Sequence, residues 1–301
     1  MKLVQIQKNG KPSLGILTEQ GVIDVHAEAA LKGITMPADM WEVIAGGKPT
    51  LDLLLQQIGG KPTLDLLEKF AKRAECFIDP AHCPLAPVIT GTDRVFCIGL
   101  NYRQHAAECG LPLPPAPVLF NKFGNALAAH NEEITLMPDY KEYDYEAELV
   151  VVIGKPARNV SEEEALDYVF GYTCGNDLSC RDLQFARGNQ WVLSKTFDGF
   201  APIGPCLVTA NAMDPNALAI SSKVNGQVRQ NSNTSDMIFT PAQIIADLSR
   251  HFTLQPGDLI FTGTPQGVMH GYPADKKDWL KPGDEVEVSI EGIGTLRNTF
   301  I

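Results

Sequence analysis

The stretch Asp144-Tyr-Glu-Ala-Glu-Leu-Val-Val-Val-Ile153 passes from alternating carboxylates into a continuous apolar run. A run of this kind is typical of a strand that is buried on both faces. Glu146 and Glu148 stand at positions i and i+2, so a strand would turn both side chains to one face, about 7 Å apart at roughly 3.3 Å per residue. Because an unpaired buried charge is costly, carboxylates that lead into a buried strand need a partner.

A third carboxylate, Asp177, follows in Gly175-Asn-Asp-Leu-Ser179. Oxygen ligands suit Mg²⁺, Mn²⁺ or Ca²⁺ better than zinc. Cys174 and Cys180 flank Asp177, but soft thiolates match a hard cation poorly. We therefore predict a hard-metal site made by the three carboxylates. The alternative is that the alternating acidic residues form the solvated face of a half-exposed strand.

Composition limits the classes of function. The chain has 301 residues, of which 44% are hydrophobic and 20% charged, and its formal net charge is −11. The negative charge argues against binding to nucleic acid or to anionic membranes. The N-terminal sequence lacks an apolar signal core, and seven cysteines without a Cys-x-x-Cys pair favour free thiols in a reducing compartment. We expect a cytoplasmic protein.

The first part of the chain differs in pattern from the rest. Residues 1–25 alternate as strands do, and residues 38–77 have a helical pattern. The helical part contains an identical nine-residue repeat, Gly46-Gly-Lys-Pro-Thr-Leu-Asp-Leu-Leu54 and Gly59-Gly-Lys-Pro-Thr-Leu-Asp-Leu-Leu67, and each proline stands where a helix can begin. A Pro-rich stretch at 79–87 is the best boundary. We predict a small α+β domain over residues 1–78 and a catalytic, metal-binding domain over 88–301.

Glycine, proline and asparagine divide the second part into short elements. Asn225-Gly226 is a hairpin signal, and a Pro-Gly-Asp turn introduces a strand at both 256 and 282. A capping box at Ser161 predicts a helix that ends near Phe170-Gly171. We expect strands over 95–100, 259–261 and 285–290 and a further helix over 101–109. The fold class is β-rich α+β.

His105 and Glu108 stand three residues apart on the predicted helix, so they share a face. Glu108 can orient the imidazole and make it more basic, which gives a general base for water. An isolated pair of this type is more often a surface contact. Arg181 and Gln184 follow Asp177 at helical spacing and would lie near the ion.

Several long segments resemble the fumarylacetoacetate hydrolase superfamily over residues 93–301. Long motifs in the right order are far more specific than any one of them. They are Gly99-Leu-Asn-Tyr-Arg-Gln-His-Ala-Ala-Glu108, Asp144-Tyr-Glu-Ala-Glu-Leu149, Gly171-Tyr-Thr-Cys-Gly-Asn-Asp-Leu-Ser-Cys-Arg-Asp-Leu-Gln184, Ser194-Lys-Thr-Phe-Asp-Gly-Phe-Ala-Pro-Ile-Gly204, Val224-Asn-Gly-Gln-Val-Arg-Gln230 and Phe261-Thr-Gly-Thr-Pro-Gln-Gly-Val268.

The resemblance implies a homodimeric enzyme whose catalytic domain is a mixed β-roll or β-sandwich. It implies Mg²⁺ or Mn²⁺ on the three carboxylates and a small 2-oxo acid as substrate. By position, His105, Glu108 and Lys195 would be catalytic, and the substrate-binding residues would be Lys122, Arg181, Gln184 and Thr264. Phe123 replaces the proline of a family Lys-Pro motif, and His130 stands in a stretch that is usually richer in glycine.

The expected reaction is hydrolysis of a C–C bond in a 2,4-dioxo acid such as an acylpyruvate or fumarylacetoacetate, through an enolate beside the cation and Lys195. An oxaloacetate decarboxylase, or an isomerase or dehydratase of a 2-oxo acid, would use the same enolate. A non-catalytic scaffold is the other class of function. Against it stands the presence of Glu146, Glu148, Asp177 and Lys195 together.

Overall fold

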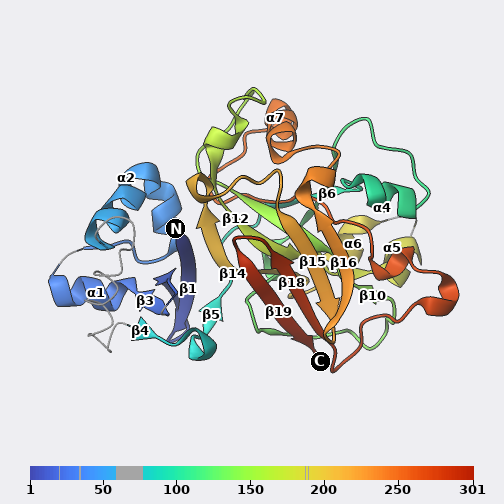
Figure 1. Ribbon diagram of the computed structural model, residues 1–301, viewed down its shortest axis with the longest axis horizontal. Coiled ribbons are helices and arrows are strands. Elements are labelled where there is room, and N and C mark those ends of the chain that lie inside the picture. The colour runs from blue at the N-terminus through green and yellow to red at the C-terminus, as the bar shows by residue number, and fades with distance from the viewer. Residues whose placement is uncertain (20, 34, 59–76, 187, 189) are drawn as a thin grey trace.

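The computed structural model describes residues 1–19, 21–33, 35–58, 77–186, 188 and 190–301. Within these residues the strands form two packed sheets and one short ribbon (Figure 1). The large sheet has twelve strands. Its main path, in spatial order, is β4 (Phe77–Ile78), β3 (Val22–Asp24), β2 (Lys11–Leu17), β1 (Lys2–Lys8), β14 (Ala201–Thr209), β12 (Val169–Asn176), β11 (Ala147–Ile153), β17 (Leu259–Phe261), β6 (Val95–Gly99) and β7 (Val118–Lys122).

The remaining strands complete the architecture. Two short strands join the large sheet from its sides: β5 (Leu85–Ala86) pairs with β1, and β8 (Leu127–Ala128) pairs with β14. The second sheet has the order β16 (Gln227–Asn233), β15 (Ala219–Val224), β18 (Glu285–Ile290), β19 (Gly294–Phe300) and β9 (Glu133–Ile134). A ribbon of β10 (Tyr143–Asp144) and β13 (Ser179–Cys180) lies beside them.

Helices lie at the edges of the sheets. The α-helices are α1 (Val25–Lys32), α2 (Met40–Ile58), α4 (Arg103–Glu108), α5 (Arg181–Ala186), α6 (Trp191–Lys195) and α7 (Pro241–His251). Short 3₁₀ turns are η2 (Pro80–His82), η3 (Gly124–Ala126), η4 (Ala165–Tyr168), η5 (Ala210–Ala212), η6 (Thr234–Asp236), η7 (Met269–Gly271) and η8 (Ala274–Lys276). No helix of the described ranges is both long and apolar enough to cross a membrane.

β11 supplies side chains to two hydrophobic cores, as its continuous apolar run predicted. Leu149 and Val151 point into the core between the two sheets. Val150 and Val152 point to the opposite face, where they join a second core that includes residues of α1 and α2. Because burial of a Val or Leu side chain is worth about 1.5–3 kcal/mol, this strand is held firmly in register. Its rigid end carries the acidic residues.

The N-terminal strands continue the large sheet. β1 pairs with β14 through Lys2 and Val208 and through Leu3 and Leu207. In Figure 1 the blue N-terminal segment, with α1 and α2, lies to the left of the second sheet. The division into two domains at 79–87 stays a prediction.

Most of the expected elements are present, and the β-rich α+β class is confirmed. Asn225 and Gly226 have positive φ angles of 50° and 77° and join β15 to β16, as a two-residue hairpin requires. In the first repeat copy α2 is kinked at Gly47, and Pro49 lies within the helix after the kink. The second copy lies outside the described residues.

The helix expected from Ser161 to Phe170-Gly171 is wrong. The Ser161 hydroxyl does accept from the backbone N–H of Glu164 at 3.3 Å, but only the 3₁₀ turn η4 follows. Phe170 and Gly171 already belong to β12, because pairing with β11 and β14 outweighs the local capping signal.

Candidate active site

The paired strands β11 and β12 bring the three predicted metal carboxylates together. Ala147 lies opposite Asn176, and the backbone N–H of Asp177 donates to the carbonyl of Glu146 at 2.9 Å. Glu146, Glu148 and Asp177 each offer an oxygen within 4.8 Å of the others. Their exposed fractions are 7%, 2% and 0%. Carboxylates this close repel one another unless positive charge lies between them.

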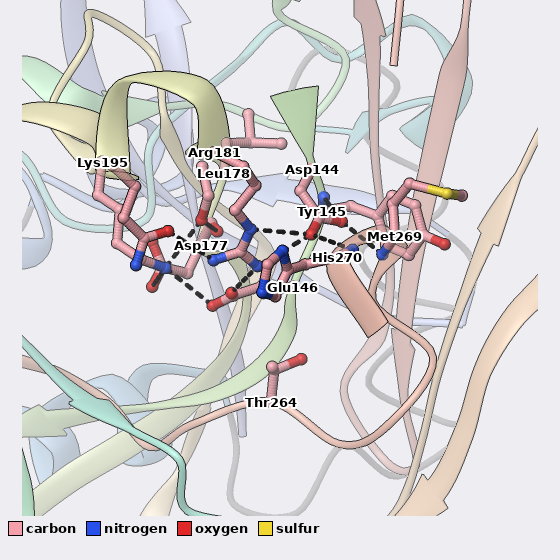
Figure 2. Close-up of polar contacts among 12 residues, drawn as sticks. Asp144, Tyr145, Glu146, Asp177, Leu178, Arg181, Lys195, Thr264, Met269 and His270 are labelled. Atoms are coloured by element: carbon pink, nitrogen blue, oxygen red, sulfur yellow. Dashed lines mark hydrogen bonds and ion pairs between the residues drawn. The ribbon is translucent and has the colours of Figure 1, made fainter. Parts of the chain in front are cut away.

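Two cationic side chains flank Glu146 (Figure 2). Lys195 Nζ donates to Glu146 Oε2 at 3.0 Å, to Asp177 Oδ2 at 2.8 Å and to Ser179 Oγ at 2.8 Å. Arg181 Nη2 donates to Glu146 Oε1 at 2.5 Å. Burial favours the neutral acid, but Lys195 and Arg181 outweigh it and lower the pKa of Glu146 to about 2. Glu146 is therefore ionised near neutral pH.

Lys122 lies behind Asp177 and is fully buried. Its Nζ is 2.6 Å from Asp177 Oδ1 and donates to the carbonyls of Leu178 and Phe200 at 2.9 and 2.6 Å. Burial lowers the pKa of Lys122, although Asp177 opposes the shift. Two carbonyls and one carboxylate of the protein thus surround this ammonium, which the sequence predicted to bind substrate.

Glu148 has no such cationic partner among the described residues. Its Oε2 accepts one hydrogen bond, from the backbone N–H of Gly263 at 2.7 Å. Burial, and then the charges of Asp177 and Glu146, raise the pKa of Glu148 well above its usual value. A divalent cation beside these oxygens would remove that cost. The donor set, three buried carboxylates, fits Mg²⁺ or Mn²⁺.

The predicted pair of His105 and Glu108 is present on α4. His105 Nδ1 lies 3.3 Å from Glu108 Oε2, and the backbone N–H of Gly267 donates to Glu108 Oε1 at 3.0 Å. Burial by itself lowers the pKa of His105, but hydrogen bonds with Cys109 and Glu108 raise it to about 9. Glu146 also contributes to the increase, which places the imidazole within electrostatic reach of the metal carboxylates.

Gln184 and Thr264 are hydrogen-bonded to other parts of the protein near the carboxylates. Gln184 Oε1 accepts from Arg181 Nη1 at 3.0 Å. The Thr264 hydroxyl donates to the carbonyl of Ala147 at 3.0 Å and accepts from Gln230 Nε2 at 2.8 Å. Thr264 thus contacts β11 directly, Gln184 contacts Arg181, and the contact of both side chains with substrate stays a prediction.

Family comparison agrees with this geometry. The family described as fumarylacetoacetate (FAA) hydrolase, C-terminal, matches residues 94–301. The chain belongs to the fumarylacetoacetate hydrolase family. The match includes all ten predicted site residues and the whole of the second sheet, so the expected family is confirmed.

Relatives in this family are similar over 71% to 100% of this chain. The oxaloacetate tautomerase FAHD2A, mitochondrial, of Bos taurus is 39% identical over 307 residues, covering 100% of this chain and 92% of its own. The fumarylacetoacetate hydrolase domain-containing protein 2 homolog of Dictyostelium discoideum is 48% identical over 224 residues, covering 71% of this chain and 72% of its own.

Solved structures show the same fold. The fumarylacetoacetate hydrolase of psychrophilic Exiguobacterium antarcticum has a TM-score of 0.81 at 32% identity, covering 100% of this chain and 99% of its own. Fumarylpyruvate hydrolase from Pseudomonas aeruginosa, in complex with Mn²⁺ and pyruvate, has a TM-score of 0.63 at 37% identity, covering 73% and 97% of the two chains.

Sequence reasoning missed two residues beside this family site. Asp144 contacts Arg181, and the ring of His270 stacks on Phe185 with centroids 5.1 Å apart. Asp144 stands two residues before Glu146, so its position on the same strand face was a usable signal. No local pattern marks His270, because the loop that carries it is far from the carboxylates in sequence.

Proposed function

We propose that this protein is a divalent-metal-dependent enzyme that moves a proton at C3 of a small 2-oxo diacid, with keto–enol tautomerisation of oxaloacetate as its first activity. The supporting observation is the buried trio Glu146, Glu148 and Asp177, in which Glu148 lacks a cationic partner, near the His105–Glu108 pair. The full-length tautomerase relatives favour this reaction over the C–C hydrolysis that the sequence put first.

The three carboxylates would hold the Mg²⁺ or Mn²⁺ ion. When bound, the ion would supply positive charge beside the 2-oxo oxygen and the carboxylate of the substrate. Lys195 keeps its ammonium between Glu146 and Asp177, where it orients both ligands. Burial disfavours this charge, but Asp177 and Glu146 raise the pKa of Lys195 overall.

The His105–Glu108 pair would carry the proton. In its neutral form the imidazole would take a proton from C3, the electron pair would move onto the 2-oxo oxygen, and the imidazolium would then give its proton to that oxygen to form the enol. Glu108 stabilises the imidazolium that forms, because its carboxylate lies 3.3 Å from Nδ1. Arg181 and Gln184, which are hydrogen-bonded to each other, would bind the far carboxylate of the substrate.

Hydrolysis of a 2,4-dioxo acid is the second candidate. The same imidazole would take a proton from water, and the hydroxide would add to C4. The C3–C4 bond would then break to release a carboxylic acid and an enolate, and the imidazolium would return the proton to C3 to give the 2-oxo acid. The hydrogen bond from Gly267 to Glu108 favours this alternative, since it fixes the pair as a water-activating base requires. Decarboxylation of oxaloacetate, or isomerisation or dehydration of a 2-oxo acid, would also use the three metal carboxylates and Lys195.

The test is a direct rate comparison. Enol oxaloacetate absorbs ultraviolet light more strongly than the keto form, so the rate of ketonisation can be followed with and without Mg²⁺ or Mn²⁺. Release of pyruvate from a panel of acylpyruvates would be measured beside it. Glu148→Gln should abolish the metal-dependent rate, whereas the matched control Glu287→Gln, on β18, should not. Metal-independent ketonisation by the wild type would contradict the proposal.

Assembly and location also remain proposals. We infer a homodimer, supported by large apolar side chains exposed on the described surface at Leu111, Leu113, Phe123 and Leu193. No nucleic-acid or membrane partner is proposed. A cytoplasmic location stays a prediction, and the tautomerase relatives are named as mitochondrial proteins.

A further inference from the structure

The loop from Gly263 to Gly271 contacts three parts of the site through its backbone. The N–H of Gly263 donates to the proposed metal ligand Glu148 at 2.7 Å. The N–H of Gly267 donates to Glu108, the partner of His105, at 3.0 Å. Further along the loop, the N–H groups of Met269 and His270 donate to Asp144, which is neither a proposed metal ligand nor part of the His105–Glu108 pair. One short segment thus contacts both the proposed metal carboxylates and the His105–Glu108 pair.

Glycine is required where this loop passes closest to its neighbours. Gly263 and Gly267 both have φ of +98°, a conformation that other residues adopt only with strain. A Cβ at Gly271 would lie 2.4 Å from Cδ of Glu108, so the loop packs directly against that carboxylate. The position of Glu108 therefore depends on where the loop is fixed.

Asp144 holds the loop at Met269 and His270. Its side chain is fully buried, and Oδ1 accepts from the N–H groups of Tyr145 at 2.9 Å and Met269 at 2.7 Å. Oδ2 accepts from the N–H of His270 at 3.0 Å and from Arg181 Nε at 2.9 Å. Figure 2 shows Asp144 between Arg181 on one side and Met269 and His270 on the other.

Arg181 continues the connection to the metal site. Its Nη2 lies 2.9 Å from Asp144 Oδ2 and 2.5 Å from Glu146 Oε1, and its Nη1 donates to Gln184. The rigid fork of a guanidinium sets the direction of both carboxylates that it pairs with. Glu146 is thus oriented from the same point, Asp144, that holds the loop on Glu108.

We propose that Asp144 is a positioning residue that sets the metal carboxylates and the His105–Glu108 pair relative to each other. This inference rests on the proposed function, because it assigns Asp144 no contact with substrate or metal. It makes a specific claim about two separate properties. Loss of Asp144 should weaken metal binding through Arg181 and Glu146, and should slow proton transfer through the loop and Glu108.

The experiment uses the whole chain and Mn²⁺ alone as the first probe, with free Mn²⁺ measured by electron paramagnetic resonance. Asp144→Asn replaces an accepting oxygen with a donor and removes the charge that faces Arg181. We expect about 10- to 100-fold weaker Mn²⁺ binding, the usual cost of losing a residue that orients a metal ligand. We also expect a lower kcat for ketonisation at saturating Mn²⁺.

Asp258→Asn is the matched control. Asp258 is also buried, pairs with Arg94 at 3.2 Å and accepts from the N–H of Gln255 at 2.7 Å, but it belongs to neither half of the site. It should lower the Tm as any buried ion-pair loss does, and leave the Mn²⁺ affinity within about twofold of the wild type.

Two further variants separate the two connections and keep the test informative if Asp144→Asn does not fold. Arg181→Lys keeps the charge but cannot bridge Asp144 and Glu146, so it should weaken Mn²⁺ binding. Gly271→Ala should push on Glu108, lower kcat and leave Mn²⁺ binding unchanged. The reverse pattern in this pair would overturn the proposal, as would wild-type Mn²⁺ affinity and kcat in Asp144→Asn. A wild-type protein that binds no Mn²⁺ would instead contradict the proposed function.

Discussion

Lys122 Nζ lies 2.6 Å from Asp177 Oδ1, and both side chains are fully buried. The opposite oxygen of Asp177 is bound by Lys195. Asp177 is therefore held by an ammonium on each side. We propose that Lys122 fixes this ligand from behind, in place of the substrate contact that the sequence suggested.

Lys122→Met should destabilise the protein by about 3–5 kcal/mol, because it leaves Asp177 buried without one of its partners. Urea unfolding, followed by circular dichroism, measures this change. The control is Lys223→Met. Lys223 is exposed and lies 3.9 Å from Glu287, and an exposed ion pair of this kind contributes about 0–1 kcal/mol to stability. Equal losses in the two variants would contradict a structural role for Lys122.

Glu148→Gln should raise the Tm of the metal-free protein. The folded-state pKa of Glu148 is raised, so its contribution to stability is full below the unfolded pKa and is lost as pH rises through the folded pKa. Each kcal/mol recovered at neutral pH corresponds to about 2–4 °C in Tm. Calorimetry from pH 5 to pH 8 in EDTA would test this. A wild-type Tm that increases relative to the Tm of Glu148→Gln as pH rises would oppose it.

Added Mn²⁺ should reverse the order of the two proteins. Binding to the folded state alone stabilises it by about 2.7 kcal/mol when the free ion is at 100 times its Kd. The wild type should gain this stability and Glu148→Gln should not. A Tm that is independent of Mn²⁺, Mg²⁺ and EDTA in the wild type would show that the three carboxylates hold no ion.

Glu108→Gln should move the pH profile of kcat/KM to lower pH. Burial lowers the pKa of His105, but Cys109 and Glu108 raise it to about 9, so the imidazole is mostly protonated at pH 7 and gains activity as a base as pH rises. Without the Glu108 charge the rising limb should begin at lower pH and reach a lower plateau. Cys109→Ala should shift it in the same direction. A limb that moves to higher pH would exclude His105 as the base.

Sedimentation equilibrium should give a mass of twice the 32.8 kDa chain at micromolar concentration. The exposed apolar residues Leu111, Leu113 and Phe123 should be covered in that assembly, because patches of this kind mark contact surfaces. Leu113→Glu is then expected to shift the mass toward that of one chain, whereas Val228→Glu, at another exposed apolar residue, provides the control. A wild type that sediments as a single chain would rule out the dimer.

Much of the fold follows from local pattern. The apolar run 149–153 determined a strand with two buried faces, and Asn225-Gly226 determined a hairpin, because both signals act over a few residues. The capping box at Ser161 also acts over a few residues, but the helix that it predicted does not form. It is a local preference, and the sheet pairing of Val169–Asn176 is a longer-range contact that outweighs it.

The site was predictable where family motifs carry the residues, and less so where partners come from distant segments. Glu146, Glu148 and Asp177 lie together as their strand spacing indicated. The fully buried state of Lys122 depends on the carbonyls of Leu178 and Phe200, which sequence spacing does not bring near. The contact of Gly267 with Glu108 joins residues that are 159 positions apart.

The central claim is that metal-bound protein moves a proton at C3 of oxaloacetate through His105. The most direct measurement is the exchange of the C3 hydrogens of oxaloacetate with D₂O, followed by NMR, for Mg²⁺-loaded wild type and His105→Ala. We predict exchange well above the protein-free rate in the wild type and about a 10²- to 10⁴-fold smaller enzymatic rate in the variant. Equal exchange rates in the two proteins would contradict it.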